Sequence, residues 1–175
     1  MAVRLEGAIA LRKALRKFEP DLAKETQKEI ASFLKPVVKE ARGYLPNNTA
    51  TLSNWSAANK REGAKFPYYD YQIAKRGITY KTSPSKANRR GFRSLASIFN
   101  KTAAGAIYET AGRKNPNSTF VKNIEAKYPS KMVGKDKMQG RAMFRAYEEN
   151  EGKAQDGVIR AIEKAAVKFK VATNG

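Results

Sequence analysis

Apolar residues at helical spacing dominate the first third of the chain. The first set, spaced alternately by three and four positions, consists of Ala8, Leu11, Leu15, Phe18 and Leu22. This spacing places one apolar stripe along a helix. Glu19-Pro20-Asp21 interrupts the pattern, because a proline disfavours the helical conformation in the residue before it. Pro20 suits the first turn of a new helix, so two successive helices are predicted.

A second apolar stripe follows this start. Its members are Ile30, Phe33, Leu34, Val37, Val38 and Ala41. They form one broad helical face, which ends before Gly43 and Pro46. Pro36 lies inside the stripe. Since proline lacks an N–H and clashes with the carbonyl four residues earlier, it predicts a kink or a fresh helix start at this point.

Short aromatic and β-branched runs, separated by turn formers, occupy the middle of the chain. The predicted strands are Tyr68–Ile73, Ile78–Thr82, Leu95–Phe99 and Ala106–Glu109. Such runs between turn residues are typical of short antiparallel strands. Trp55 is expected to anchor an earlier strand or turn. Residues 112–136 show little periodicity and predict a long, mobile loop, because loops of this length are usually functional or partly disordered.

The last third returns to helical spacing. Ala142, Met143, Ala146 and Tyr147 form a short stripe, and Val158, Ile159, Ile162, Ala165, Ala166 and Phe169 form a longer one. Glu148–Gly152 is expected to be a loosened joint between them. The order of helices, strands and helices predicts an α+β fold. A single domain over residues 1–175 would pack a long kinked N-terminal helix and C-terminal helices on a small antiparallel β-sheet.

Composition removes several classes of function. The chain has no cysteine and no histidine, so thiol catalysis, thiolate metal sites, and the commonest general base and metal ligand are excluded. No catalytic residues, cofactor or metal are expected. Asp70 and Glu109 are the carboxylates of the central strands, and the pair is a weak signal for acid–base chemistry. No apolar run is long enough to span a bilayer, and the N-terminus is not a signal peptide, so cytoplasmic synthesis and use are predicted.

Positive charge is the feature of the composition that says most about a binding partner. The chain has 35 Lys and Arg against 16 Asp and Glu, a net charge of +19. The candidate residues that face DNA or a partner are Lys75, Arg76, Lys81, Lys86, Arg89, Arg90 and Arg93. Fields of one sign attract polyanions. A solvated basic surface is an equal alternative, although the run Lys86–Arg93 is short and loop-like and can reach a phosphate backbone without reading sequence.

The order of the segments resembles a family of phage proteins. The long helix ending in Val37–Pro46, followed by Thr49–Leu52 and Trp55, looks like the start of siphophage neck or tail-completion proteins. Ala104–Gly112 resembles that family's tyrosine–alanine, glutamate and glycine motif, although Tyr108 directly precedes the glutamate here. Gly140–Ala146 is similar to versions in phages of actinobacteria.

The resemblance implies a structural virion protein, not an enzyme, at the neck or top of the tail. It implies a homo-oligomeric ring, a hexamer, between the head-closure connector and the tail terminator, with genomic double-stranded DNA in the lumen and no membrane contact. Apart from the resemblance, the many nearby cations predict that Glu109 forms a structural or intersubunit ion pair. A tail terminator or head-closure protein of the same joint is one alternative, and a free, sequence-independent DNA-binding protein is another.

Overall fold

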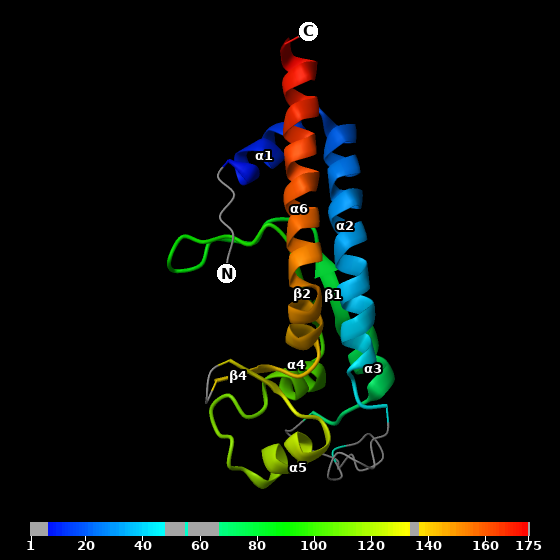
Figure 1. Cartoon of the computed structure of the whole chain (residues 1–175), viewed down its shortest axis with the longest axis vertical. Coiled ribbons are helices and arrows are strands. Elements are labelled where there is room, and N and C mark those ends of the chain that lie inside the picture. Colours follow the sequence, from blue (N-terminus) through cyan, green and yellow to red (C-terminus); the bar gives the residue numbers. More distant parts are fainter. Residues whose placement is uncertain (1–6, 48–54, 56–66, 134–136, 175) are drawn as a thin grey trace. The chain divides into compact units, whose positions relative to one another are not determined.

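The computed structural model describes residues 7–47, 55, 67–133 and 137–174. Within these residues the chain has six helices and two two-stranded sheets (Figure 1). The predicted α+β class is therefore confirmed. The chain divides into two compact units, which are described separately. The first comprises Met1–Pro36, Tyr80–Ser97 and Asn150–Gly175, and the second comprises Val37–Thr79 and Ile98–Glu149.

Three helices contribute to the first unit. Helix α1 spans Ala8–Phe18, α2 spans Pro20–Gly43 and α6 spans Met143–Asn174. The predicted break at Glu19-Pro20 is confirmed, with Pro20 in the first helical position. Helix α2 continues through Pro36, so a fresh helix start at that proline is wrong. Helix α6 continues through Glu148–Gly152, so the predicted joint in this segment is also wrong.

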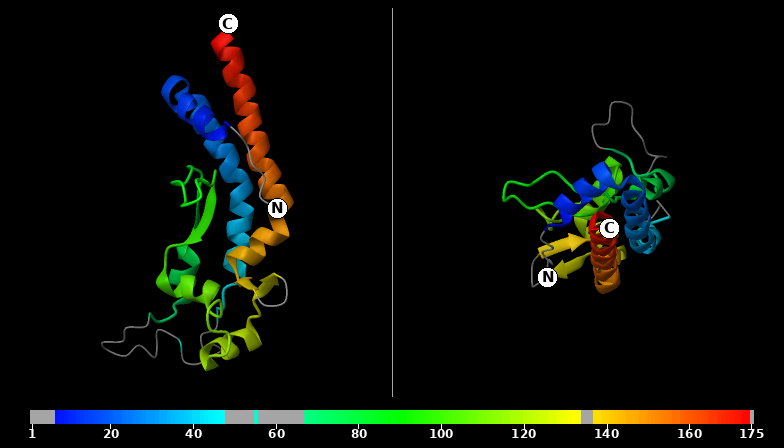
Figure 2. Two further views of the ribbon diagram at one scale, coloured as in Figure 1. Left: turned by 90° about the vertical axis from the view of Figure 1, so that its left-hand side faces the viewer. Right: turned by 90° about the horizontal axis from the view of Figure 1, so that it is seen from above.

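The first unit pairs α2 with α6 in antiparallel order, and the two helices lie side by side in both views of Figure 2. The Lys168 ammonium lies 2.6 Å from the Glu25 carboxylate, and Lys164 lies 3.4 Å from Glu29. From Glu25 to Glu29 the chain of α2 advances by four residues, while the partners on α6 go back by four, from Lys168 to Lys164. The two helices therefore run antiparallel. These ion pairs are exposed and contribute little to stability.

Apolar packing stabilises this helix pair. Leu15 of α1, Ala23 of α2 and Ala165 of α6 form a buried cluster. Leu11, Leu22 and Phe169 pack against that cluster. Small alanines on α2 and α6 allow the helices to approach closely while the leucines of α1 cover the junction. The predicted apolar stripes therefore supply most of this cluster, although Phe18 of the first stripe is exposed.

Short elements build the second unit. They are α3 (Tyr71–Gly77), α4 (Ala103–Thr110), α5 (Thr119–Lys127), β3 (Lys131–Val133) and β4 (Lys137–Gly140). Strands β1 (Ile78–Lys81) and β2 (Ser97–Asn100) each have residues in both units. Strand β1 pairs with β2, and the two strands overlap the predicted strands at 78–82 and 95–99. Strand β3 pairs antiparallel with β4, with Lys131 opposite Gly140 and an irregularity in register after Lys131.

Three predicted segments differ from the structure. Tyr68–Ile73 and Ala106–Glu109 were expected as strands, but α3 begins at Tyr71 and α4 covers the second run. Residues 112–136 were expected as one long loop, but they contain α5 and β3. Polar side chains start all three helices, because each accepts a hydrogen bond from an N–H of the first turn. These N-caps are Asp70, Thr102 and Ser118.

Aromatic rings form the core of the second unit. The ring of Trp55 lies 5.2 Å from that of Tyr69 and 5.1 Å from that of Phe120. Tyr108 lies 6.2 Å from Tyr69 and 6.1 Å from Tyr128. Burial raises the pKa of Tyr69 and Tyr108, so both hydroxyls stay neutral donors. Trp55 is buried, but the strand or turn that it is expected to anchor lies outside the described residues.

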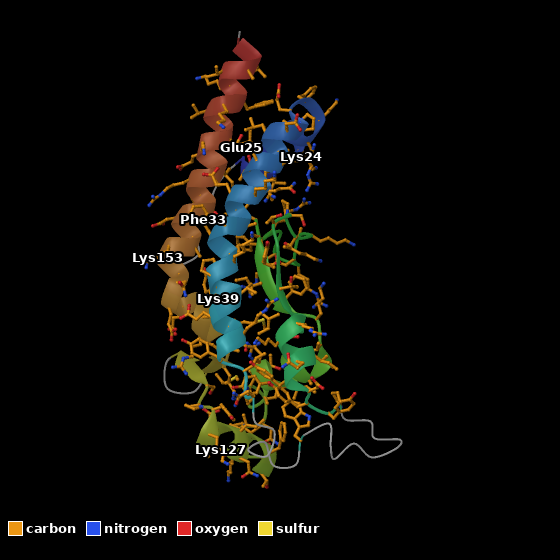
Figure 3. All side chains as sticks on the ribbon, turned by 90° about the vertical axis from the view of Figure 1, so that its right-hand side faces the viewer. Lys24, Glu25, Phe33, Lys39, Lys127 and Lys153 are labelled. Atoms are coloured by element: carbon orange, nitrogen blue, oxygen red, sulfur yellow. The ribbon has the colours of Figure 1, made fainter. Side chains whose placement is uncertain are left out.

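Two glycines of α6 provide a matched test of the packing in the first unit. A Cβ at Gly157 would clash with the ring of Phe33, which Figure 3 labels on α2, whereas a Cβ at Gly152 meets nothing within 4 Å. We expect Gly152→Ala to stabilise the protein by up to about 1 kcal/mol through helix propensity. Gly157→Ala should destabilise it, since overpacking costs about 1–3 kcal/mol. Urea unfolding measures both, and equal stabilisation by the two variants would contradict the contact with Phe33.

Candidate functional site

A narrow, ordered loop connects β1 with β2. We call residues 82–96 the basic arm; Figure 1 draws it in green, extending from the two strands. The Ser85 N–H donates to the Ser94 carbonyl at 2.9 Å, and the Asn88 N–H donates to the Phe92 carbonyl at 2.8 Å. Residues 85–94 are all exposed. The arm is thus held by its own backbone hydrogen bonds and not by a core.

A single asparagine organises the tip of the arm. The Asn88 carbonyl accepts from the Gly91 N–H at 2.9 Å, which closes a tight turn. Its side-chain oxygen accepts from the N–H groups of Arg90 at 2.9 Å and Phe92 at 3.0 Å. Asparagine commonly stabilises turns in this way. Gly91 has a φ of 79°, a left-handed conformation that favours glycine.

The arm collects four of the seven predicted basic residues. They are Lys86, Arg89, Arg90 and Arg93, and all four are exposed. None of them has a carboxylate partner among the described residues. The large apolar side chain beside them, Phe92, is 61% exposed. The tip of the arm is therefore a concentrated group of uncompensated cations around one exposed ring.

The other three predicted basic residues lie elsewhere. Lys75 and Arg76 belong to α3 in the second unit, and Lys81 ends β1. The Lys75 ammonium lies 5.2 Å from the centre of the Tyr71 ring, which is within the range of a cation–π interaction. The arm portion of the predicted basic window, which lies within one unit, is therefore the compact candidate site.

Arg12 of α1 anchors the base of the arm. Its side chain is only 6% exposed. One terminal nitrogen donates to the Leu95 carbonyl at 2.7 Å, and the other donates to the Thr82 carbonyl. Burial, with a smaller repulsion from Arg16, lowers the pKa of Arg12, although a guanidinium remains charged in proteins. One side chain thus fixes both ends of the arm, a role that the sequence pattern did not reveal.

Glu109 has a structural role in the second unit. Its carboxylate is 5% exposed. It accepts hydrogen bonds from the N–H groups of Ala142 at 2.8 Å, Met143 at 3.1 Å and Phe144 at 2.9 Å. These groups start α6, where unpaired N–H donors and the helix dipole favour an anion. The predicted intersubunit ion pair needs an accessible carboxylate, whereas this one is buried and bonded to its own backbone.

Arg141 complements Glu109 from the adjacent position. It is 2% exposed and donates to the carbonyls of Tyr108 at 2.9 Å, Ala111 at 2.7 Å and Tyr128 at 3.2 Å. It also forms a 2.6 Å ion pair with Glu125. Burial alone raises the pKa of Glu125, but hydrogen bonds from Ser130 and Arg141 outweigh this effect and hold it below its ordinary value.

A cleft of about 300 Å³ lies beside this network within the second unit. Tyr44, Tyr128, Arg141 and Arg145 are among its lining residues. The Arg145 guanidinium lies 4.5 Å from the centre of the Tyr44 ring and its Nε donates to Glu149 at 3.2 Å. The Tyr44 hydroxyl donates to Glu149, which raises the pKa of Tyr44 to about 12. The cleft's arginines are therefore already engaged within the chain.

The two carboxylates considered for catalysis are used by the backbone. Asp70 accepts from the Ile73 N–H at 2.8 Å and starts α3, while Glu109 starts α6. No group of three or more acidic side chains in the described part of the chain is placed to hold a metal ion. Among the helices of the same residues, none has the length and apolarity of a membrane span. The exposed arm is consequently the strongest candidate for function.

No protein-family model matches the sequence, and no curated protein or solved structure is significantly similar to the chain. The resemblance to siphophage neck proteins therefore stays a prediction. Function has to be inferred from the chemistry and placement of the basic arm and from the structural roles of the buried polar residues.

Removal of the Glu109 carboxylate should destabilise the start of α6. We expect Glu109→Ala to lower the free energy of unfolding by about 2–4 kcal/mol, because three N–H groups at the start of α6, one of them fully buried, lose their acceptor. Glu163→Ala on the same helix is the control, since Glu163 is exposed and should matter by less than about 0.5 kcal/mol. Denaturant unfolding measures both variants. Equal stabilities would show that Glu109 does not cap α6.

Loss of the Arg12 contacts should loosen the base of the arm. In Arg12→Lys a single ammonium cannot span two carbonyls as a guanidinium does. We expect the first tryptic cleavage within the arm to become several-fold faster, measured by mass spectrometry over time. Arg16→Lys is the matched control on α1, because Arg16 is exposed. Cleavage at the wild-type rate in Arg12→Lys would mean that Arg12 does not anchor the arm.

Proposed function

We propose that the protein is a structural, non-enzymatic subunit at the head–tail joint of a long-tailed bacteriophage. In this role it assembles with its own copies into a ring between the head-closure connector and the tail terminator. Genomic DNA passes through the ring. The motifs at Ala104–Gly112 and Gly140–Ala146 suggest the family, and the arrangement of side chains supports an assembly role.

The basic arm is the observation that carries this proposal. Its exposed residues 85–94 are ordered by backbone hydrogen bonds and by Asn88, yet they bury no core in their own chain. Ordering a segment costs conformational entropy. An arm that is ordered but unburied, with a buried arginine at its base, is typical of a segment that contacts another molecule.

Exposed apolar residues add support for an assembly role. Val167 and Val171 lie four residues apart on α6 and are 65% and 71% exposed, and Phe18 at the end of α1 is 60% exposed. Residues four apart share one face of a helix. A ring is built from heterologous interfaces, in which two different surfaces of the subunit meet, and such an interface would cover this face of α6.

Side chains of the types that an enzyme would use have structural roles in this chain. Glu109 and Asp70 cap helices, and Arg141 binds three carbonyls. This use of buried polar groups supports a scaffold over a catalyst. A free DNA-binding protein is a second candidate, favoured by the net charge of +19, and it predicts no stable association with virions.

Quantitative mass spectrometry of purified virions tests the proposal. We expect the protein in every preparation at a low, fixed copy number relative to the capsid protein, as a single ring requires. Purified protein should also form a closed oligomer, or do so when its neck partners are added. Absence from virions would overturn the proposal and favour the free DNA-binding protein.

A further inference from the structure

We propose that the basic arm binds the phosphate backbone of double-stranded DNA and does not read its sequence. The contact residues are Lys86, Arg89, Arg90 and Arg93. This inference rests on the proposed function, because genomic DNA would pass the arm at the head–tail joint. It assigns the DNA contact to the arm and not to the other basic residues of the central segment.

Charge provides the first argument. No acidic residue lies between Asp70 and Glu109 in the sequence, and the four arm cations have no carboxylate partner among the described residues. Elsewhere in the first unit, Lys164 and Lys168 are paired with glutamates of α2. The arm therefore holds cations that the described residues leave without an acidic partner, and a polyanion is the ligand that compensates several at once.

The chemistry of the side chains provides the second argument. Three of the four cations are arginines, whose planar guanidinium matches a phosphate through two parallel hydrogen bonds. Arg89 and Arg90 occupy the turn that the Asn88 carbonyl closes, and Arg93 follows the returning segment. Fixed backbone positions reduce the entropy that binding must overcome. The anchoring of both arm ends by Arg12 serves the same purpose.

Shape favours DNA over an acidic protein surface. The arm is a narrow loop whose two sides are joined by hydrogen bonds between Ser85 and Ser94 and between Asn88 and Phe92. Exposed basic side chains on such a loop can donate to phosphate oxygens of duplex DNA, and these contacts hold a protein on DNA without reading its bases. A protein–protein contact of similar affinity usually centres on buried aromatic anchors. The arm instead has one aromatic ring, Phe92, which is exposed, and four exposed cations within residues 85–94.

The number of contacts sets the expected salt dependence. Four neutralised phosphates predict a slope of about −3.6 for log affinity against log salt, since each contributes about −0.9. Affinity should then fall about 150-fold between 50 and 200 mM salt. A protein that used most of its charge of +19 would show a much steeper slope.

Two variants with the same loss of charge test the inference. The arm variant carries Lys86→Gln, Arg89→Gln, Arg90→Gln and Arg93→Gln. The control variant carries Lys122→Gln, Lys153→Gln, Arg160→Gln and Lys170→Gln, at exposed positions outside the arm. Figure 3 labels Lys153 on α6. Binding of the full-length proteins to a fluorescent duplex of mixed sequence is measured by anisotropy at several salt concentrations.

We expect the arm variant to lose nearly all of the salt-dependent affinity and the control variant to keep the wild-type slope. Equal losses in both variants would overturn the inference, because binding would then depend on diffuse charge. Duplex binding that the arm variant retains would overturn it as well. An arm variant that binds DNA normally but no longer joins virions would identify the arm's partner as a protein.

The virion measurement keeps this inference separate from the proposed function. Absence of the wild-type protein from virions rejects the role at the joint, whatever the arm binds. Presence in virions together with arm-independent DNA binding rejects only the arm assignment. Circular dichroism of both variants confirms that they fold, and the exposed positions of all eight substitutions make this the expected result.

Discussion

The buried guanidinium of Arg141 is the interaction on which the second unit depends. It binds the carbonyls of Tyr108 and Ala111 at the end of α4 and that of Tyr128 at the end of α5. Helix C-termini carry unpaired carbonyls and partial negative charge, so a cation stabilises both. The next three residues then offer their N–H groups to Glu109, which belongs to α4 itself. One short segment therefore joins the ends of two helices to the start of a third.

Arg12 uses the same chemistry in the first unit for a different result. It also donates to main-chain carbonyls from a buried position, but these carbonyls belong to the two ends of an exposed loop. A lysine could satisfy only part of either arrangement, because an ammonium is a point charge without a planar fork. Arg141 therefore stabilises an interior, and Arg12 holds the basic arm in a defined position on the surface.

Helical periodicity made the long elements predictable, whereas the short elements and the site required tertiary information. The stripes at Ala8–Leu22 and Val158–Phe169 span several turns, so their spacing is unambiguous. Helices α3 and α4 have only 7 and 8 residues, too few for a period to emerge, and their aromatic residues favoured strands. Asp70 and Thr102 were the available signals, as N-caps. Arg12 binds the carbonyls of Thr82 and Leu95, which lie 70 and 83 positions away in the sequence. A contact between residues so far apart produces no local sequence pattern.

The same distinction explains why net charge alone could not identify the functional surface. The net charge of +19 counts every Lys and Arg equally. However, Arg12 and Arg141 already donate hydrogen bonds to main-chain carbonyls. Lys164 and Lys168 are already paired with glutamates. Cations that are satisfied inside the chain do not attract a ligand strongly, since their fields are compensated or screened. The cations of the arm differ because they are exposed, have no carboxylate partner within the described part of the chain, and are carried by a backbone that hydrogen bonds hold in place. Charge becomes informative about a partner only after the structural arginines have been separated from the exposed ones.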